Sequence, residues 1–85
     1  MSGWLDDLAE ALGVDPLTNE EIGQLLPAAR EVAHRVERKD TPLATFLLGL
    51  ATGQRVGAGT ARPEASRAAV ETALASLPEE PPPAG

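Results

Sequence analysis

Three basic side chains recur at four-residue spacing in the middle of the chain: Arg30, His34 and Arg38. Positions i, i+4 and i+8 lie along one ridge of an α-helix, so we predict a basic ridge on a single helix. A further helix start is expected at Thr41, where free backbone N–H groups would add donors for an anion. Arg30, His34 and Arg38, with the hydroxyls of Thr41 and Thr45, form the candidate site for a partner or an anion. The alternative is an ordinary solvated helix face.

The same residues give little sign of catalysis. His34 is the only histidine, and so the only side chain that ordinarily titrates near neutral pH. A general base also needs an orienting acid and a substrate proton or nucleophile within reach, and arginines flank His34 instead. The absence of cysteine excludes disulfides, thiolate nucleophiles and Cys-ligated metals. We therefore predict no enzyme and no catalytic residue, and a structural role for His34.

Two other motifs are weaker still. The glycine-rich run GQRVGAGTAR lacks the Lys–Ser/Thr pair and the preceding strand of a phosphate-binding loop, so we interpret it as a connector of about ten residues. Asp6, Asp7 and Glu10 have no histidine beside them and suit the positive end of a helix. No metal and no cofactor is predicted.

Composition sets broad limits on function. The 85-residue chain has a formal net charge of −6 and a pI near 4.5, which disfavours a general nucleic-acid binder and an anionic-membrane-surface protein. The start MSGWLDDLAE is acidic where a signal peptide is basic, and no apolar run is long enough to span a membrane. We expect a cytoplasmic location.

Apolar residues recur with helical periodicity, which predicts an all-α bundle of four helices. The expected limits are residues 4–12, 18–38, 42–52 and 63–77, with Gly13 as a C-cap and Thr18 and Glu21 as a capping box. Pro27 kinks the second helix or divides it, which would make five helices. The domain is predicted to cover residues 1–77, and the proline- and glutamate-rich tail 78–85 is predicted to be disordered.

The third expected helix is apolar on most of its circumference, so we predict that it is the central, buried helix. Its main stripe is made of Leu43, Phe46, Leu47 and Leu50. Leu48 is displaced from this stripe and is either an additional buried contact or a face for self-association or docking. Gly49 suggests that a neighbouring backbone approaches closely, and Gly53 is expected to end the helix.

The core predicted by these patterns is thin. Alanine supplies much of the 42% hydrophobic fraction, and there is one Trp and one Phe. Trp4 is expected to anchor the first helix on the bundle, with a role as a partner-binding hot spot as the alternative. A core this small favours an interaction module, in which a partner or a second copy supplies additional area.

Three sequence elements resemble a small actinobacterial domain family of unknown function: Trp4–Leu5, Ala33–His34–Arg35–Val36 and the segment from Pro42 to Leu47. The resemblance covers about residues 4–77, and its motifs look structural rather than chemical. Members of that family occur alone or joined to nucleotidyltransferase domains similar to molybdenum-cofactor guanylyltransferases. The resemblance implies an accessory role in molybdenum-cofactor maturation, and it carries no catalytic residue to this chain.

Three functions follow as hypotheses. The first is a non-enzymatic accessory or interaction domain that docks on a nucleotidyltransferase or a molybdoenzyme through the basic ridge. The second is a binder of a small anionic ligand, a nucleotide or pterin phosphate, on the same ridge. The third is a self-associating structural domain, in which a homodimer supports the thin core.

Overall fold

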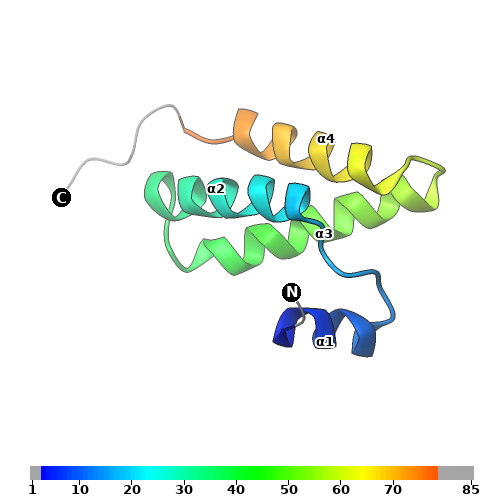
Figure 1. Cartoon of the computed structure of the whole chain (residues 1–85). Coiled ribbons are helices and arrows are strands. Elements are labelled where there is room, and N and C mark those ends of the chain that lie inside the picture. Colours follow the sequence, from blue (N-terminus) through cyan, green and yellow to red (C-terminus); the bar gives the residue numbers. More distant parts are fainter. Residues whose placement is uncertain (1–2, 79–85) are drawn as a thin grey trace.

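The computed structural model describes residues 3–78, and four α-helices form all of their regular structure (Figure 1). They are α1 (Trp4–Leu12), α2 (Asn19–Arg35), α3 (Asp40–Gly57) and α4 (Arg62–Ala75). The predicted all-α class with four helices is confirmed. The predicted tail lies outside the described residues except for Pro78. No helix among residues 3–78 has the length and apolar character that crossing a membrane requires.

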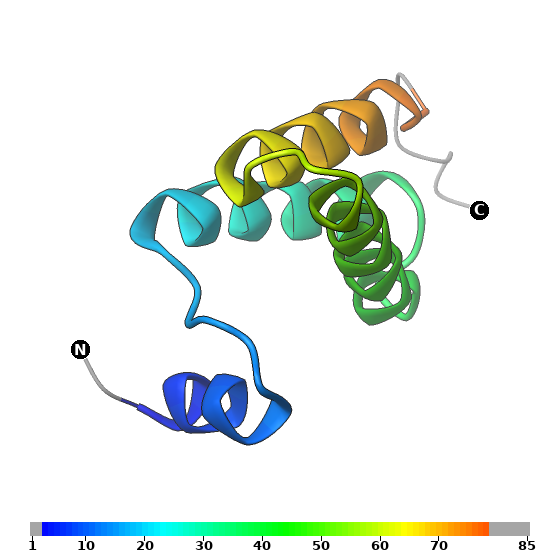
Figure 2. The same ribbon diagram turned by 90° about the vertical axis from the view of Figure 1, so that its right-hand side faces the viewer.

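The helices α2, α3 and α4 pack against one another, whereas α1, within the described part of the chain, packs against none of them. Figures 1 and 2 show α1 standing apart at the end of an extended connector. Gly13 ends α1 in the left-handed conformation, with φ of 76°, as predicted. Trp4 is 72% exposed, so the prediction that it anchors α1 on the bundle is wrong.

The second helix starts as predicted and ends early. Thr18 and Glu21 form the capping box. Pro27 lies inside one continuous helix, which settles the choice between one helix and two. At Val36 the backbone turns out of the helical region, with φ of −117° and ψ of −97°, so α2 stops at Arg35 rather than at Arg38.

The third helix is longer than predicted at both ends. It begins at Asp40, two residues before Pro42, because a proline is tolerated within the first turn, where N–H groups have no intrahelical acceptor. It continues through Gly53 to Gly57. Each internal glycine costs about 1 kcal/mol relative to alanine, and the helix is continuous in spite of this cost. The predicted ten-residue connector to α4 is reduced to residues 58–61.

Small residues form the contact between the three packed helices. Ala65 is 0% exposed and Ala28 is 2% exposed, while Ala69 and Val70 are also buried. Among residues 3–78, no large side chain is fully buried. Alanine lets helix backbones approach closely but removes little apolar area from water, so the predicted thin core is confirmed.

The apolar stripe of α3 lies on the side opposite to the one predicted. Leu48 is 9% exposed and faces the core, as the first of its two alternatives has it. The stripe expected to form the core is exposed instead, and we call it the outer face of α3; its members are Leu43 (63% exposed), Phe46 (67%), Leu47 (64%) and Leu50 (49%). Periodicity shows that these residues share one side, but neighbouring helices decide which side is covered, and α2 and α4 lie on the side of Leu48.

Candidate functional site

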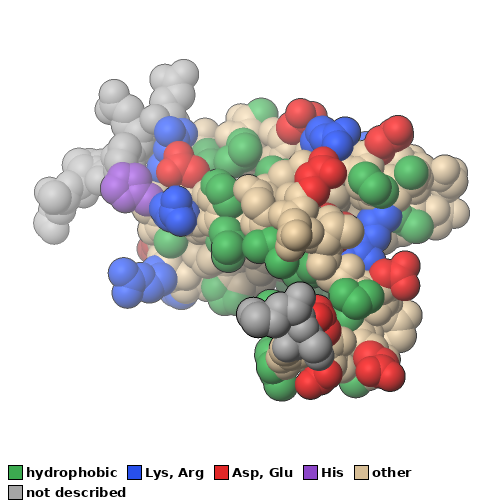
Figure 3. Space-filling view, in the orientation of Figure 1, with side chains coloured by type: hydrophobic (Ala, Val, Ile, Leu, Met, Phe, Trp, Pro, Cys, Tyr) green, Lys and Arg blue, Asp and Glu red, His purple; other side chains and the backbone are tan. Residues whose placement is uncertain are grey.

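The predicted basic ridge is interrupted by the end of α2. Arg30 and His34 lie on α2 with exposed side chains. Arg38 lies in the turn between α2 and α3, so it does not continue the four-residue helical spacing, and the prediction of a single ridge through all three residues is wrong. Lys and Arg side chains and the histidine still gather at this end of the bundle (Figure 3).

The two threonines assigned to the ridge contribute no free surface hydroxyl. The Thr41 hydroxyl oxygen is buried and has no hydrogen-bond partner. The Thr45 hydroxyl donates to the carbonyl oxygen of Pro42 at 2.9 Å, and Thr45 lines a groove that none of the three basic residues lines. The five predicted site residues therefore do not converge on one point.

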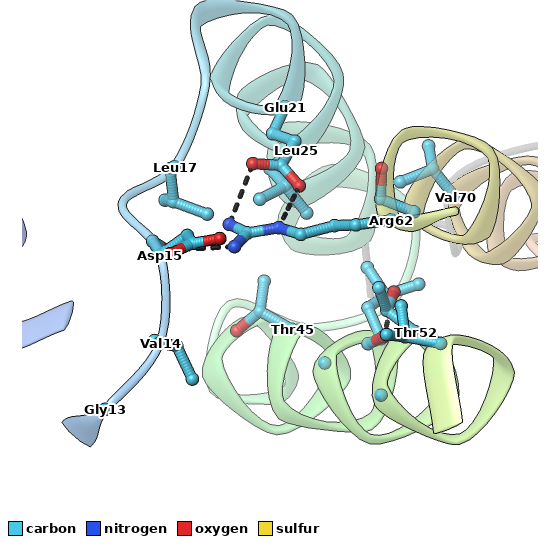
Figure 4. Close-up of a pocket in the computed structure, with 15 residues that line it drawn as sticks. Gly13, Val14, Asp15, Leu17, Glu21, Leu25, Thr45, Thr52, Arg62 and Val70 are labelled. Carbon is cyan, nitrogen blue, oxygen red and sulfur yellow. Dashed lines mark hydrogen bonds and ion pairs between the residues drawn. The ribbon is translucent and has the colours of Figure 1, made fainter. Parts of the chain in front are cut away.

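That groove is an open hollow of about 670 Å³ among the described residues (Figure 4). The connector between α1 and α2 forms one wall through Val14 and Leu17, and α3 forms another. Leu25 of α2 and Val70 of α4 supply apolar surface between them. The groove thus lies between the connector and the place where α2, α3 and α4 pack together.

One arginine holds the connector in place beside the groove. Nε of Arg62 donates to Oε2 of Glu21 at 2.7 Å, and Nη2 donates to Oε1 of Glu21 at 2.9 Å. Nη1 donates to the carbonyl oxygen of Asp15 at 2.9 Å, and Nη2 also donates to that of Pro16 at 3.3 Å. We call this set the Arg62 clamp. A bidentate guanidinium–carboxylate pair is stronger and more directional than a single contact, so the clamp joins α2, α4 and the connector.

The clamp also determines the charge state of Glu21. Burial raises the pKa of this carboxyl, but hydrogen bonds from Arg62 and from the backbone N–H of Thr18 outweigh burial, and the net pKa of Glu21 is lowered. Hydrogen bonding to Glu21 raises the pKa of Arg62. Both groups are therefore charged near neutral pH and engaged with each other.

The α3 wall of the groove includes Gly49 and Gly53, one helical turn apart. A Cβ built at either glycine meets no atom within 4 Å, so the predicted close approach of a neighbouring backbone at Gly49 is wrong. The glycines instead leave the α3 backbone open to the groove, where a second backbone has room to approach.

Two hydroxyl groups that line the groove already have partners. The hydroxyl of Thr52 donates to the Leu48 carbonyl at 2.8 Å, and that of Ser66 donates to the Pro63 carbonyl at 3.2 Å. Within residues 3–78 no group of three or more His, Cys, Asp or Glu side chains is placed to hold a metal ion. The groove therefore offers apolar walls and helix backbone, a surface suited to binding.

Sequence reasoning missed this site because its parts are distant along the chain. Glu21 was recognised only as the third helical residue of a capping box, and Arg62 as the last residue of a connector. Forty-one positions separate them. The one available signal was an arginine directly before Pro63, at a helix start where a cation is unfavourable and needs a local anion.

A family model described as Domain of unknown function (DUF6457) matches residues 1–84. No curated protein and no solved structure matches the chain.

Proposed function

Because the chain belongs to the DUF6457 family, whose description names no activity, we propose a function from the groove. The domain is a non-enzymatic interaction module, and its groove binds an amphipathic helix of a partner protein. The observation that carries this proposal is the combination of apolar walls with an α3 wall opened by Gly49 and Gly53.

A helix suits this groove better than a polar ligand. Helix-in-groove recognition uses apolar anchors at three- and four-residue spacing against a hydrophobic channel. Of the charged residues that line the groove, Glu21 and Arg62 are already paired with each other and Asp15 is an anion, so an anionic ligand would gain little from them. Glycine in the groove wall lets a helix backbone come close, which increases the contact area along the length of the bound helix.

The class of partner comes from the sequence resemblance. The resemblance implies an actinobacterial family with fusions to nucleotidyltransferases of molybdenum-cofactor synthesis. We propose that this chain serves such an enzyme or its molybdoenzyme client in the cytoplasm, as an accessory domain. The net charge of −6 argues against nucleic acid as the partner.

Calorimetry with a purified molybdenum-cofactor nucleotidyltransferase tests the proposal. The groove variant is Gly53→Leu, whose side chain enters open space and should leave the helix intact. We expect it to weaken binding at least about tenfold, the effect of losing a well-packed contact. Arg30→Ala, at the exposed end of the bundle, is the matched control and should bind like the native chain.

The outcomes separate the parts of the proposal. Binding that survives Gly53→Leu and is lost in Arg30→Ala would place the interface on the basic side chains and contradict the groove. No binding by the native chain would contradict the partner class. Amide exchange in the bound state gives a further check, because a helix in the groove should slow exchange in the connector, residues 13–17.

The anionic-ligand hypothesis remains as the second candidate. One observation favours it: among the described residues no carboxylate forms an ion pair with Arg30, His34 or Arg38. Titration with GTP should then produce binding that falls in Arg30→Ala and with added salt. Absence of binding by the native chain would remove this candidate.

A further inference from the structure

The outer face of α3 is an apolar surface separate from the groove. Leu43, Phe46, Leu47 and Leu50 are at positions i, i+3, i+4 and i+7, so they form one continuous stripe. Each is at least 49% exposed. Single exposed apolar residues are normal, but a contiguous stripe of four large ones marks an interaction site.

The lack of charged residues along this stripe favours a partner whose contact surface is also uncharged. Between Asp40 and Arg55, α3 carries no charged residue. The chain as a whole has a net charge of −6, so two copies repel each other through most of their surfaces. The outer face is the part of α3 on which two copies meet without bringing like charges together.

We infer that a second copy of this chain docks on the outer face of α3, giving an antiparallel, two-fold symmetric pair of α3 helices. The two-fold axis passes between Phe46 and Leu47. Leu43 of one copy then faces Leu50 of the other, and Phe46 faces Leu47. The stripe is its own complement under this rotation, as an isologous interface requires.

The ends of the stripe supply complementary charges. In the antiparallel pair, the start of α3 in one copy lies beside the end of α3 in the other. Helical geometry places Asp40 and Arg55 on the same flank of α3, so Asp40 of each copy approaches Arg55 of the second copy. Two such ion pairs select the antiparallel orientation over the parallel one, in which like residues meet.

The apolar area that the outer face can bury predicts a weak dimer. The outer face is about six-tenths exposed, and its four side chains remove roughly 200–300 Å² of apolar area per copy when covered. A stable interface buries about 800 Å² per partner, so flanking surface must contribute and the total stays small. Dimerisation should therefore depend on concentration in the micromolar to millimolar range.

Sedimentation equilibrium of the full chain tests the proposal from about 10 μM to 1 mM, which brackets weak association. The average mass of the native chain should rise from 8.8 kDa towards twice that value. Phe46→Glu should weaken dimerisation at least about tenfold by placing charge at the centre of the stripe. Leu74→Glu, an exposed leucine on α4, is the matched control and should dimerise normally.

A charge exchange tests the orientation. Asp40→Arg and Arg55→Asp should each weaken the dimer, and the double variant should restore it, because the two ion pairs form again with reversed sign. A spin label at Gln54→Cys should report two labels about 22 Å apart along the helix axis, from a rise of 1.5 Å per residue. The chain contains no native cysteine that would compete for the label.

A constant mass of 8.8 kDa to the highest concentration would overturn the proposal and leave the outer face to a different protein. Equal loss of dimer in Leu74→Glu and Phe46→Glu would also overturn it, because the interface would not be specific to α3. Labels at Gln54 that meet at short distance would show a parallel pair and contradict the two-fold arrangement.

Discussion

The two sides of α3 differ in how far their apolar side chains are buried. On the inner side, where α3 packs against α2 and α4, Leu48 is 9% exposed. On the outer side, Phe46 is 67% exposed and the larger apolar side chains face outward. The buried hydrophobic residues of the bundle are thus alanines, one leucine and one valine, while the larger side chains of the outer face stay available for binding. Core position and residue size are decoupled in this domain, which is the arrangement expected of an interaction module.

Leu48→Ala is the strongest test of this difference. Removing a buried leucine loses transfer free energy and leaves a cavity, so the free energy of unfolding should fall by about 2–4 kcal/mol. Urea unfolding followed by circular dichroism measures it. For an 85-residue domain with a thin core, that loss is a large part of the total stability. A change below about 0.5 kcal/mol would show that Leu48 is not a core residue.

Arg62→Met tests the groove side of the bundle. It keeps much of the side-chain length but removes the bidentate partner of Glu21, whose side chain is 5% exposed. We expect a loss of about 1–3 kcal/mol, the cost of leaving a buried acceptor without its donors. Amide exchange should show faster opening of the connector, residues 13–17. Unchanged exchange there would contradict the role of the clamp.

The pH dependence of folding stability also tests the pairing of Glu21 with Arg62. The folded pKa of Glu21 lies below its ordinary value of 4.5, so the unfolded chain binds a proton more readily. The stabilisation is complete above pH 4.5 and is lost as pH falls through the folded pKa. Acid unfolding of Glu21→Gln should therefore be shallower below pH 4.5 than that of the native chain. Parallel acid-unfolding curves for the two proteins would show that folding does not lower the pKa of Glu21.

Leu43→Ala on the outer face should have the smallest effect. The side chain is 63% exposed, so its truncation should change the unfolding free energy by less than about 0.5 kcal/mol. The measurement uses dilute protein, where the monomer dominates. A loss comparable to that of Leu48→Ala would remove the distinction between the two sides of α3.

Local features of the chain were predictable because they depend on neighbouring residues. The capping box at Thr18 and Glu21 and the glycine C-cap at Gly13 both form within one helical turn. The number of helices and the all-α class follow from the apolar periodicity. The amino-acid composition likewise determined that the core would be thin.

The ends of α2 and α3 and the candidate site could not be predicted in this way. Local signals stop α3 at Gly53, but the helix continues to Gly57, and residues 53–57 are exposed. Conversely, α2 ends at Arg35, which separates Arg38 from the helix of His34 and breaks the expected ridge. The ends of α2 and α3 therefore do not follow from the capping and glycine signals alone.

The sequence by itself determined the helices, their first caps and the scarcity of large core residues, because backbone hydrogen bonding and apolar spacing act over short distances. Only the tertiary structure decided that Leu48 faces inward and Phe46 outward, because a mostly apolar helix has several sides that satisfy the same periodicity. It also decided that Arg62 meets Glu21, since a contact across 41 positions depends on how three helices pack.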